Sequence, residues 1–140
     1  MSIKFAEKDY EIKKCFAALK ELYPDLKENG FVERIKNQFL EGYKLAYLEK
    51  DDQIVTVAGF RLLDTQHWGK ILYLDDLVTL SAYRWQGYGG KMLKWLEKEA
   101  RHDGCQELHL SSSFHRHQAH AVYLKYGYRL ISHYFAKKLD

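Results

Sequence analysis

The chain has 140 residues, of which 46% are hydrophobic and 29% are charged, and its net charge is +3. This length suits one domain with one core, and the composition is globular rather than disordered. The weak positive charge argues against a nucleic-acid-binding protein, which concentrates a larger excess of Lys and Arg on one face. An anionic small-molecule ligand would suit this charge, but ordinary solubility explains it as well.

The N-terminal stretch MSIKFAEKDYEIKK has no apolar core of a signal peptide, and no apolar run reaches the length of about 18 residues that spans a membrane. We therefore expect a cytoplasmic protein with neither a membrane nor a nucleic acid as partner. Cys15 and Cys105 have no CxxC or paired spacing. This favours buried small residues over a disulfide framework.

Hydrophobic periodicity and breaker residues divide the chain into short helices and strands. The predicted elements in chain order are a strand at 2–5, a helix capped by Asp9 and ended by Pro24, a helix at 31–40, strands at 44–49, 53–63 and 70–80, a glycine loop at 81–90, a helix from Met92 to Asp103-Gly104, a strand at 107–112, a helix at 118–126 and a strand at 128–139. With no linker or repeat, the order β-α-α-β-β-β-α-β-α-β predicts a single domain over residues 1–140.

The pairing of these strands follows from their connections. The tight turn between the second and third predicted strands calls for an antiparallel hairpin. The strand–helix–strand segment at 70–112 calls for a right-handed crossover and parallel pairing. The sequence therefore predicts an α/β fold with a mixed central sheet and helices on both faces.

The segment RWQGYGG at residues 84–90 lies between a predicted strand and a predicted helix. Glycines permit close backbone approach, and the N–H groups of such a loop combine with the helix dipole to form an anion site. A diphosphate is the natural candidate, although a flexible turn explains the glycines as well. The spacing is neither GxxxxGK[ST] nor GxGxxG, because residue 92 is Met.

Two motifs resemble those of the GNAT superfamily of N-acetyltransferases. The family's cofactor motif, Arg/Gln-x-x-Gly-x-Gly/Ala after a strand ending in D-L-V, is similar to Asp76-Leu77-Val78, Tyr83-Arg84 and Gly87-Tyr88-Gly89. Its A-H-x-F-Y signature with a following Gly-aromatic pair is similar to Ala119-His120-Ala121-Val122-Tyr123 and Gly127-Tyr128. The motifs stand in the family's order, and the resemblance covers essentially the whole chain.

The resemblance implies an acetyl-CoA-dependent N-acetyltransferase that binds no metal. The backbone of Leu77, Val78 and Thr79 would pair with the pantetheine arm where a bulge splays the sheet, and the Val78 N–H would polarise the thioester carbonyl. Tyr123 would protonate the departing thiolate. Arg116 stands where the family often has a cofactor-contacting Asn, so it either reaches a phosphate or is solvated. The further implied cofactor-binding residues are Arg84, Trp85, Gln86, Gly87, Tyr88, Gly89 and Gly90.

Transfer to an amine also needs a base, because an amine is protonated at neutral pH. Asp75 and Asp76 interrupt an apolar strand, where burial would raise the pKa of a carboxyl group. Strand alternation predicts that only one of them faces the substrate. The resemblance of residues 69–77 to a strand of diamine acetyltransferases favours Asp75, although the pair could instead cap backbone groups near the bulge.

Other sources of a base are weaker. Ser111 stands where ribosomal-protein alanine acetyltransferases carry a Glu, so the base at that position is missing here. The remaining candidates are the histidines, whose spacing gives no strong zinc signature; they are His109, His115, His117 and His120.

We expect the acceptor to be a small primary amine such as a polyamine or an amino sugar, and superfamily analogy implies a homodimer. Three alternatives stay open at this point. They are a protein N-terminal or lysine acetyltransferase, a non-catalytic acyl-CoA-binding module on the same fold, and a phosphate-binding transferase that uses the glycine loop for a nucleotide.

Overall fold

The computed structural model describes residues 2–140. The chain divides into two compact units, one ending at Leu110 and the other running from Ser111 to Asp140. Within the described residues, no helix is both long enough and apolar enough to cross a membrane.

The first unit is built on a mixed sheet with the strand order β1-β2-β3-β4-β5. The strands are β1 (Ser2–Phe5), β2 (Tyr43–Lys50), β3 (Gln53–Thr65), β4 (Gly69–Thr79) and β5 (Glu107–Leu110). The pairs from β1 to β4 are antiparallel, whereas β4 and β5 are parallel. The predicted hairpin and the predicted parallel crossover are both confirmed.

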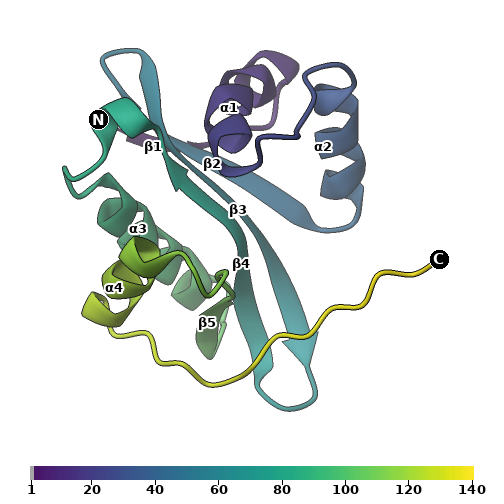
Figure 1. Ribbon diagram of the computed structural model, residues 1–140, viewed down its shortest axis with the longest axis vertical. Helices are drawn as coiled ribbons and strands as arrows, with labels where there is room; N and C mark the ends of the chain where they lie inside the picture. The colour runs from purple at the N-terminus through teal and green to yellow at the C-terminus, as the bar shows by residue number, and fades with distance from the viewer. Residues whose placement is uncertain (1) are drawn as a thin grey trace. The chain divides into compact units, whose positions relative to one another are not determined.

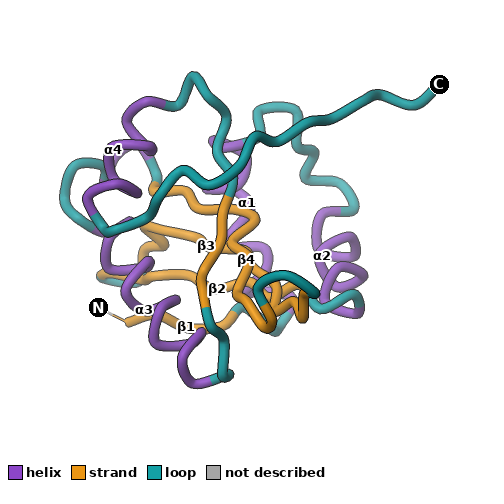
Figure 2. The backbone as a smooth tube through the Cα atoms, turned by 90° about the horizontal axis from the view of Figure 1, so that it is seen from below, coloured by secondary structure: helices purple, strands orange, loops and turns teal. Residues whose placement is uncertain are grey.

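Helices cover both faces of this sheet, as predicted (Figures 1 and 2). They are α1 (Asp9–Leu22) and α2 (Phe31–Leu40) on one face and α3 (Tyr88–His102) on the other, with a short 3-10 turn at Ser81–Tyr83 before α3. On the first face, apolar residues of α1 and α2 pack on Leu45, Val57 and Val78 of the strands. On the second face, Trp95 of α3 packs against Phe5 and Phe60.

Two helix starts differ from the prediction. The N-cap of α1 is Lys8 rather than Asp9, because the Glu11 carboxylate folds back and accepts the Lys8 N–H at 3.0 Å. Helix α3 begins at Tyr88 rather than at Met92. The reason is that Gly87, with φ of 82°, makes the left-handed entry itself, so the next two glycines already belong to the first helical turn.

The second unit contains helix α4 (His117–Lys125). The strand predicted at residues 128–139 is wrong, because the described residues after α4 carry no strand and run as loop (Figure 2). Leu130 and Phe135 are 87% and 90% exposed. An alternating pattern forms a strand only where another backbone pairs with it. Strand β5 also ends at Leu110 rather than at residue 112.

Candidate active site

The site begins at an irregularity in β4. Gly59 of β3 pairs with Asp76, but its neighbour Phe60 pairs with Leu74, so Asp75 is an extra residue in β4. This is a β-bulge, which bends a strand and redirects its side chains. The parallel ladder between β4 and β5 also ends here, at the pair Leu74↔Leu110. Within the described residues, β4 therefore continues to Thr79 without a β5 partner, as the predicted splay requires.

A cavity of about 340 Å³ lies at the bulge. Its lining residues come from the end of α2 and from β2, β3 and β4; they are Gln38, Glu41, Tyr43, Arg61, Asp75 and Asp76. The prediction that only one aspartate faces this space is wrong, because the bulge breaks the alternation that separates neighbouring side chains. The size is that of a small-molecule site, and three of the lining groups are carboxyls.

Asp75 forms an ion pair within the cavity wall. The Arg61 guanidinium donates from Nε to Oδ2 at 2.9 Å and from Nη2 to Oδ1 at 2.7 Å. The same guanidinium lies 5.4 Å from the centre of the Tyr73 ring. Such a bidentate pair fixes both side chains and uses both carboxylate oxygens.

Asp76 has different partners. The Tyr43 hydroxyl donates to Oδ2 at 2.7 Å, and the hydroxyl of Tyr23, the C-cap residue of α1, donates to Oδ1. Burial raises the pKa of Asp76, and it outweighs the two phenol hydrogen bonds, which lower it. Burial likewise raises the pKa of Tyr43, so this hydroxyl keeps its proton and acts as the donor. Asp76 is thus a carboxyl group whose pKa lies above its ordinary value, at the wall of a polar cavity.

The start of α3 is where the glycine loop predicts an anion site. Trp85 and Gly87 both have positive φ, 69° and 82°, and Trp85 is 80% exposed. A Cβ placed on Gly87 would meet nothing within 4 Å, and one on Gly89 would meet only Thr79 Oγ1, at 3.8 Å. There is therefore free space beside this first turn, and the first N–H groups of a helix have no acceptor within the helix.

Two lysines stand beside this helix start. The Nζ atoms of Lys50 and Lys91 lie 5.8 Å and 5.7 Å from the centre of the Tyr88 ring. Tyr88 itself is buried in the first turn of α3. Positive charge at a helix N-terminus favours an anion further.

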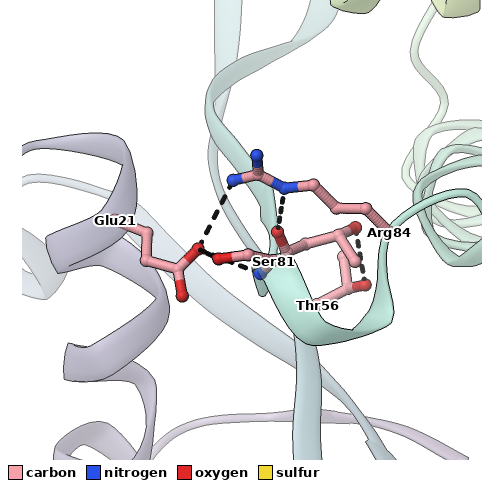
Figure 3. A network of polar contacts seen from close by, with 5 residues as sticks. Glu21, Thr56, Ser81 and Arg84 are labelled. Carbon is pink, nitrogen blue, oxygen red and sulfur yellow. Dashed lines mark hydrogen bonds and ion pairs between the residues drawn. The ribbon is translucent and has the colours of Figure 1, made fainter.

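A polar network joins α1 to the segment before α3 (Figure 3). Glu21 Oε1 accepts the backbone N–H and the hydroxyl of Ser81, at 3.0 Å and 2.7 Å. Arg84 donates from Nε to the Thr79 carbonyl at 3.0 Å and forms an ion pair with Glu21 at 3.4 Å. The Thr56 and Thr79 hydroxyls are 3.0 Å apart. Arg84, predicted as a cofactor ligand, thus also holds the backbone where β4 ends.

Tyr123 and Arg116 lie in the second unit. The ring of Tyr123 is buried and packs edge-on against Tyr128, with the ring centres 6.0 Å apart. Burial raises the pKa of Tyr123, and the nearby Arg116 lowers it. His120 Nε2 bonds the Ser113 carbonyl at 2.8 Å, which matches a structural role for this motif histidine. Among residues 2–140, no three His, Cys, Asp or Glu side chains gather as metal ligands.

The comparisons with known proteins agree with this geometry. The sequence pattern of the Acetyltransferase (GNAT) family matches residues 12–128. The chain belongs to this GNAT family. Among its relatives, the aminoalkylphosphonate N-acetyltransferase of Salmonella typhimurium strain LT2 is 32% identical over 97 residues, which cover 69% of this chain and 62% of that protein. The match thus spans less than two thirds of that relative.

Solved structures show the same GNAT fold. The apo aminoglycoside 6'-N-acetyltransferase AAC(6')-IG of Acinetobacter haemolyticus has a TM-score of 0.81 at 18% identity, with all of both chains covered. AAC(6')-Iy, in complex with a bisubstrate analogue of CoA, has a TM-score of 0.84 at 12% identity and covers 99% of this chain and 97% of that one. The predicted fold class is therefore confirmed.

Sequence reasoning missed most of the GNAT cavity wall. Five residues that line the cavity or donate a hydrogen bond to Asp76 were not predicted; they are Tyr23, Gln38, Glu41, Tyr43 and Arg61. For Arg61 a signal existed, because it is the first charged residue after an apolar run in a strand. For the two tyrosines no signal existed, because an aromatic residue beside a core looks the same whether or not its hydroxyl meets a carboxylate.

Proposed function

We propose that this GNAT protein transfers the acetyl group of acetyl-CoA directly to a small primary amine, which binds in the cavity at the β4 bulge. The observation that carries the proposal is the position of Asp76. It is a part-buried carboxyl with a raised pKa, in the wall of a cavity of about 340 Å³ on the strand whose end leads to the glycine loop. Glu41 and Gln38 add acceptors for an ammonium group.

Asp76 serves better than Asp75 as the base in this proposal. Asp75 is tied to Arg61 through both oxygens, whereas Asp76 is bound only by neutral phenols. A raised pKa also brings a carboxylate closer to the range in which it accepts a proton efficiently at neutral pH. This reverses the order of the two aspartates that the strand resemblance favoured.

The features of β4 and α3 fit acetyl-CoA as co-substrate. Residues 77–79 follow the end of the β4–β5 ladder, which suits backbone pairing with an extended pantetheine arm. The diphosphate would lie on the segment 84–90 and on the first turn of α3, near Lys50 and Lys91.

Three groups of this chain, Asp76, the Val78 N–H and Tyr123, take part in the reaction. Asp76 takes a proton from the ammonium, directly or through one water. The free amine attacks the thioester carbonyl, whose oxygen the Val78 N–H stabilises, so that the N–C bond forms and the C–S bond breaks. As the C–S bond breaks, the nitrogen releases its second proton to water and Tyr123 gives its proton to the thiolate. Tyr123 then regains a proton from water, and its raised pKa keeps it protonated at neutral pH. No covalent enzyme intermediate is needed, and burial raises the pKa of the Cys15 thiol to about 12.

The small-molecule acceptor is supported by two of the compared proteins, one named for aminoalkylphosphonates and the other for aminoglycosides. The test is thiol release from acetyl-CoA with 2-aminoethylphosphonate, spermidine, an aminoglycoside and a lysine peptide. We expect turnover with at least one of the small amines. Acetylation of the peptide alone would assign the chain to protein substrates. Protection by acetyl-CoA with no transfer to any amine would make it a binding module. The predicted homodimer stays a prediction for sedimentation analysis.

A further inference from the structure

The residue opposite Asp76 in the sheet is a glycine for a steric reason. Gly59 pairs with Asp76 across β3 and β4, directly before the register shift. A Cβ on Gly59 would overlap the Tyr43 hydroxyl and would lie 2.5 Å from Asp76 Oδ2. The φ of Gly59 is not in the left-handed region, so the backbone there does not itself demand glycine. The requirement is space for two other side chains.

That space is occupied by the hydrogen bond between Tyr43 and Asp76. The donor is the part-buried Tyr43 hydroxyl, at 2.7 Å from Oδ2. The second oxygen of the same carboxylate accepts the hydroxyl of Tyr23. Two phenols from separate elements, β2 and the end of α1, therefore hold one carboxylate, each through a different oxygen.

The hydrogen bonds that Tyr23 and Tyr43 donate to Asp76 are here called the clamp. A competing donor, the Arg61 guanidinium, lies close by. Arg61 uses Nε and one Nη for Asp75, which leaves further N–H groups on its guanidinium. A carboxylate without its phenol partners would gain by turning toward these donors. The charged and titratable groups around Asp76 are Tyr23 of α1, Glu41 at the end of α2, Tyr43 of β2, Arg61 of β3 and Asp75 of β4.

We propose that Gly59 and Tyr43 are positioning residues for Asp76. The missing side chain at Gly59 lets the Tyr43 hydroxyl reach the carboxylate, and this bond, with that of Tyr23, keeps the carboxylate at the cavity wall instead of on Arg61. The inference rests on the proposed function, in which Asp76 takes the proton of the amine. Gly59 and Tyr43 act only through Asp76 and contact no reacting atom.

The test has two readouts on the same variants. The first is a carbon-13 NMR titration of the aspartate carboxyl groups, with Asp76→Asn to assign the signal. The second is the pH profile of kcat/KM for the best amine. A phenol that donates to a carboxylate stabilises its charged form. In Tyr43→Phe the Tyr23 hydroxyl still holds Oδ1 at the cavity wall, so the carboxylate loses one donor without reaching Arg61, and the midpoint of Asp76 rises by about 1 pH unit. The acid limb of the kcat/KM profile moves to higher pH by the same amount. At a fixed pH on that limb, kcat/KM therefore falls about 10-fold.

Gly59→Ala shifts the midpoint in the same direction, because its Cβ displaces the Tyr43 hydroxyl. Added to Tyr43→Phe, it shifts the midpoint no further, since the hydrogen bond is already lost. The matched control is Tyr47→Phe in the same strand, which removes a 3.0 Å phenol–carboxylate bond to Glu11 and leaves Asp76 unchanged. If Gly59→Ala does not fold, Tyr43→Phe and its control still test the clamp.

An unchanged or lowered Asp76 midpoint in Tyr43→Phe overturns the clamp. A shifted midpoint with an unchanged acid limb overturns the catalytic link between the clamp and the reaction. If the wild type acetylates no amine, the proposed function fails by itself, whereas the carbon-13 titration still supports or overturns the clamp.

Discussion

The assignment of the glycine loop to acetyl-CoA can be tested by adding a carboxylate at Gly89. This residue lies in the first turn of α3, where a Cβ meets only Thr79 Oγ1, at the ordinary contact distance of 3.8 Å. Removing a helical glycine stabilises a helix by about 0.5–1 kcal/mol, and an acidic side chain near its N-terminus adds about 0.3–1 kcal/mol. At about 3 °C per kcal/mol, the Tm of ligand-free Gly89→Glu is expected to rise by about 2–6 °C.

The response to acetyl-CoA changes in the opposite direction. At 100 times its Kd, a ligand that binds only the folded state stabilises it by about 2.7 kcal/mol, which raises the wild-type Tm by about 8 °C. In Gly89→Glu the added carboxylate stands where the diphosphate would approach the backbone N–H groups. Steric exclusion and like charge then remove most of this shift.

The assay is thermal unfolding with and without acetyl-CoA at low and physiological salt. Gly89→Gln is the matched control, because it has the same shape without the charge and separates exclusion from repulsion. A variant with a ligand-free Tm at or above that of the wild type and a full ligand shift would refute the loop assignment. Because ligand-free Gly89→Glu is expected to have a higher Tm than the ligand-free wild type, a missing acetyl-CoA shift in this variant is distinguished from misfolding, which would lower the ligand-free Tm.

Three further outcomes are expected. Tyr123→Phe keeps acetyl-CoA affinity but lowers kcat about 100-fold, because the Tyr123 hydroxyl stays protonated at neutral pH and can give its proton to the thiolate, whereas Phe has no proton to give. An unchanged single-turnover rate contradicts this. Because burial raises the pKa of Cys15 to about 12, Cys15 in the native protein stays unmodified by a thiol reagent at pH 8, whereas the partly exposed Cys105 reacts. Rapid modification of both cysteines would contradict this prediction. Asp76→Asn gains stability over the wild type as the pH rises. The reason is that the pKa of Asp76 in the folded protein is raised above its ordinary value of 3.8. The stability that this carboxyl contributes to the wild type is therefore fully present below pH 3.8 and is lost as the pH rises through the folded-state pKa. Tm curves of variant and wild type that run parallel between about pH 4 and 8 would contradict this prediction.

Local patterns in the sequence were enough for the element order up to β5. Alternation and helical periodicity specify which face of an element is apolar, and the turn at Asp51-Asp52 and the helix end at Gly104 follow from local chemistry. The glycine loop could also be recognised, since a strand, a glycine segment and a helix in that order already define an anion site. The same reasoning failed at residues 128–139, because an alternating segment needs a partner strand that its own sequence does not provide.

The roles of the two aspartates depended on tertiary structure. From the sequence, Asp75 and Asp76 are neighbours on opposite faces of a strand. The register shift between β3 and β4 turns both aspartates toward one cavity. Arg61 forms an ion pair with Asp75, and two tyrosines donate hydrogen bonds to Asp76. Tyr43 and Asp76 are 33 residues apart, so their hydrogen bond exists only when β2, β3 and β4 are aligned with a glycine between them. The sequence by itself determined the family's fold and the place of the glycine loop between β4 and α3, because both follow from contiguous residues. Only the tertiary structure decided which partners each carboxylate has, because strand register brings Arg61 to Asp75 and Tyr43 to Asp76.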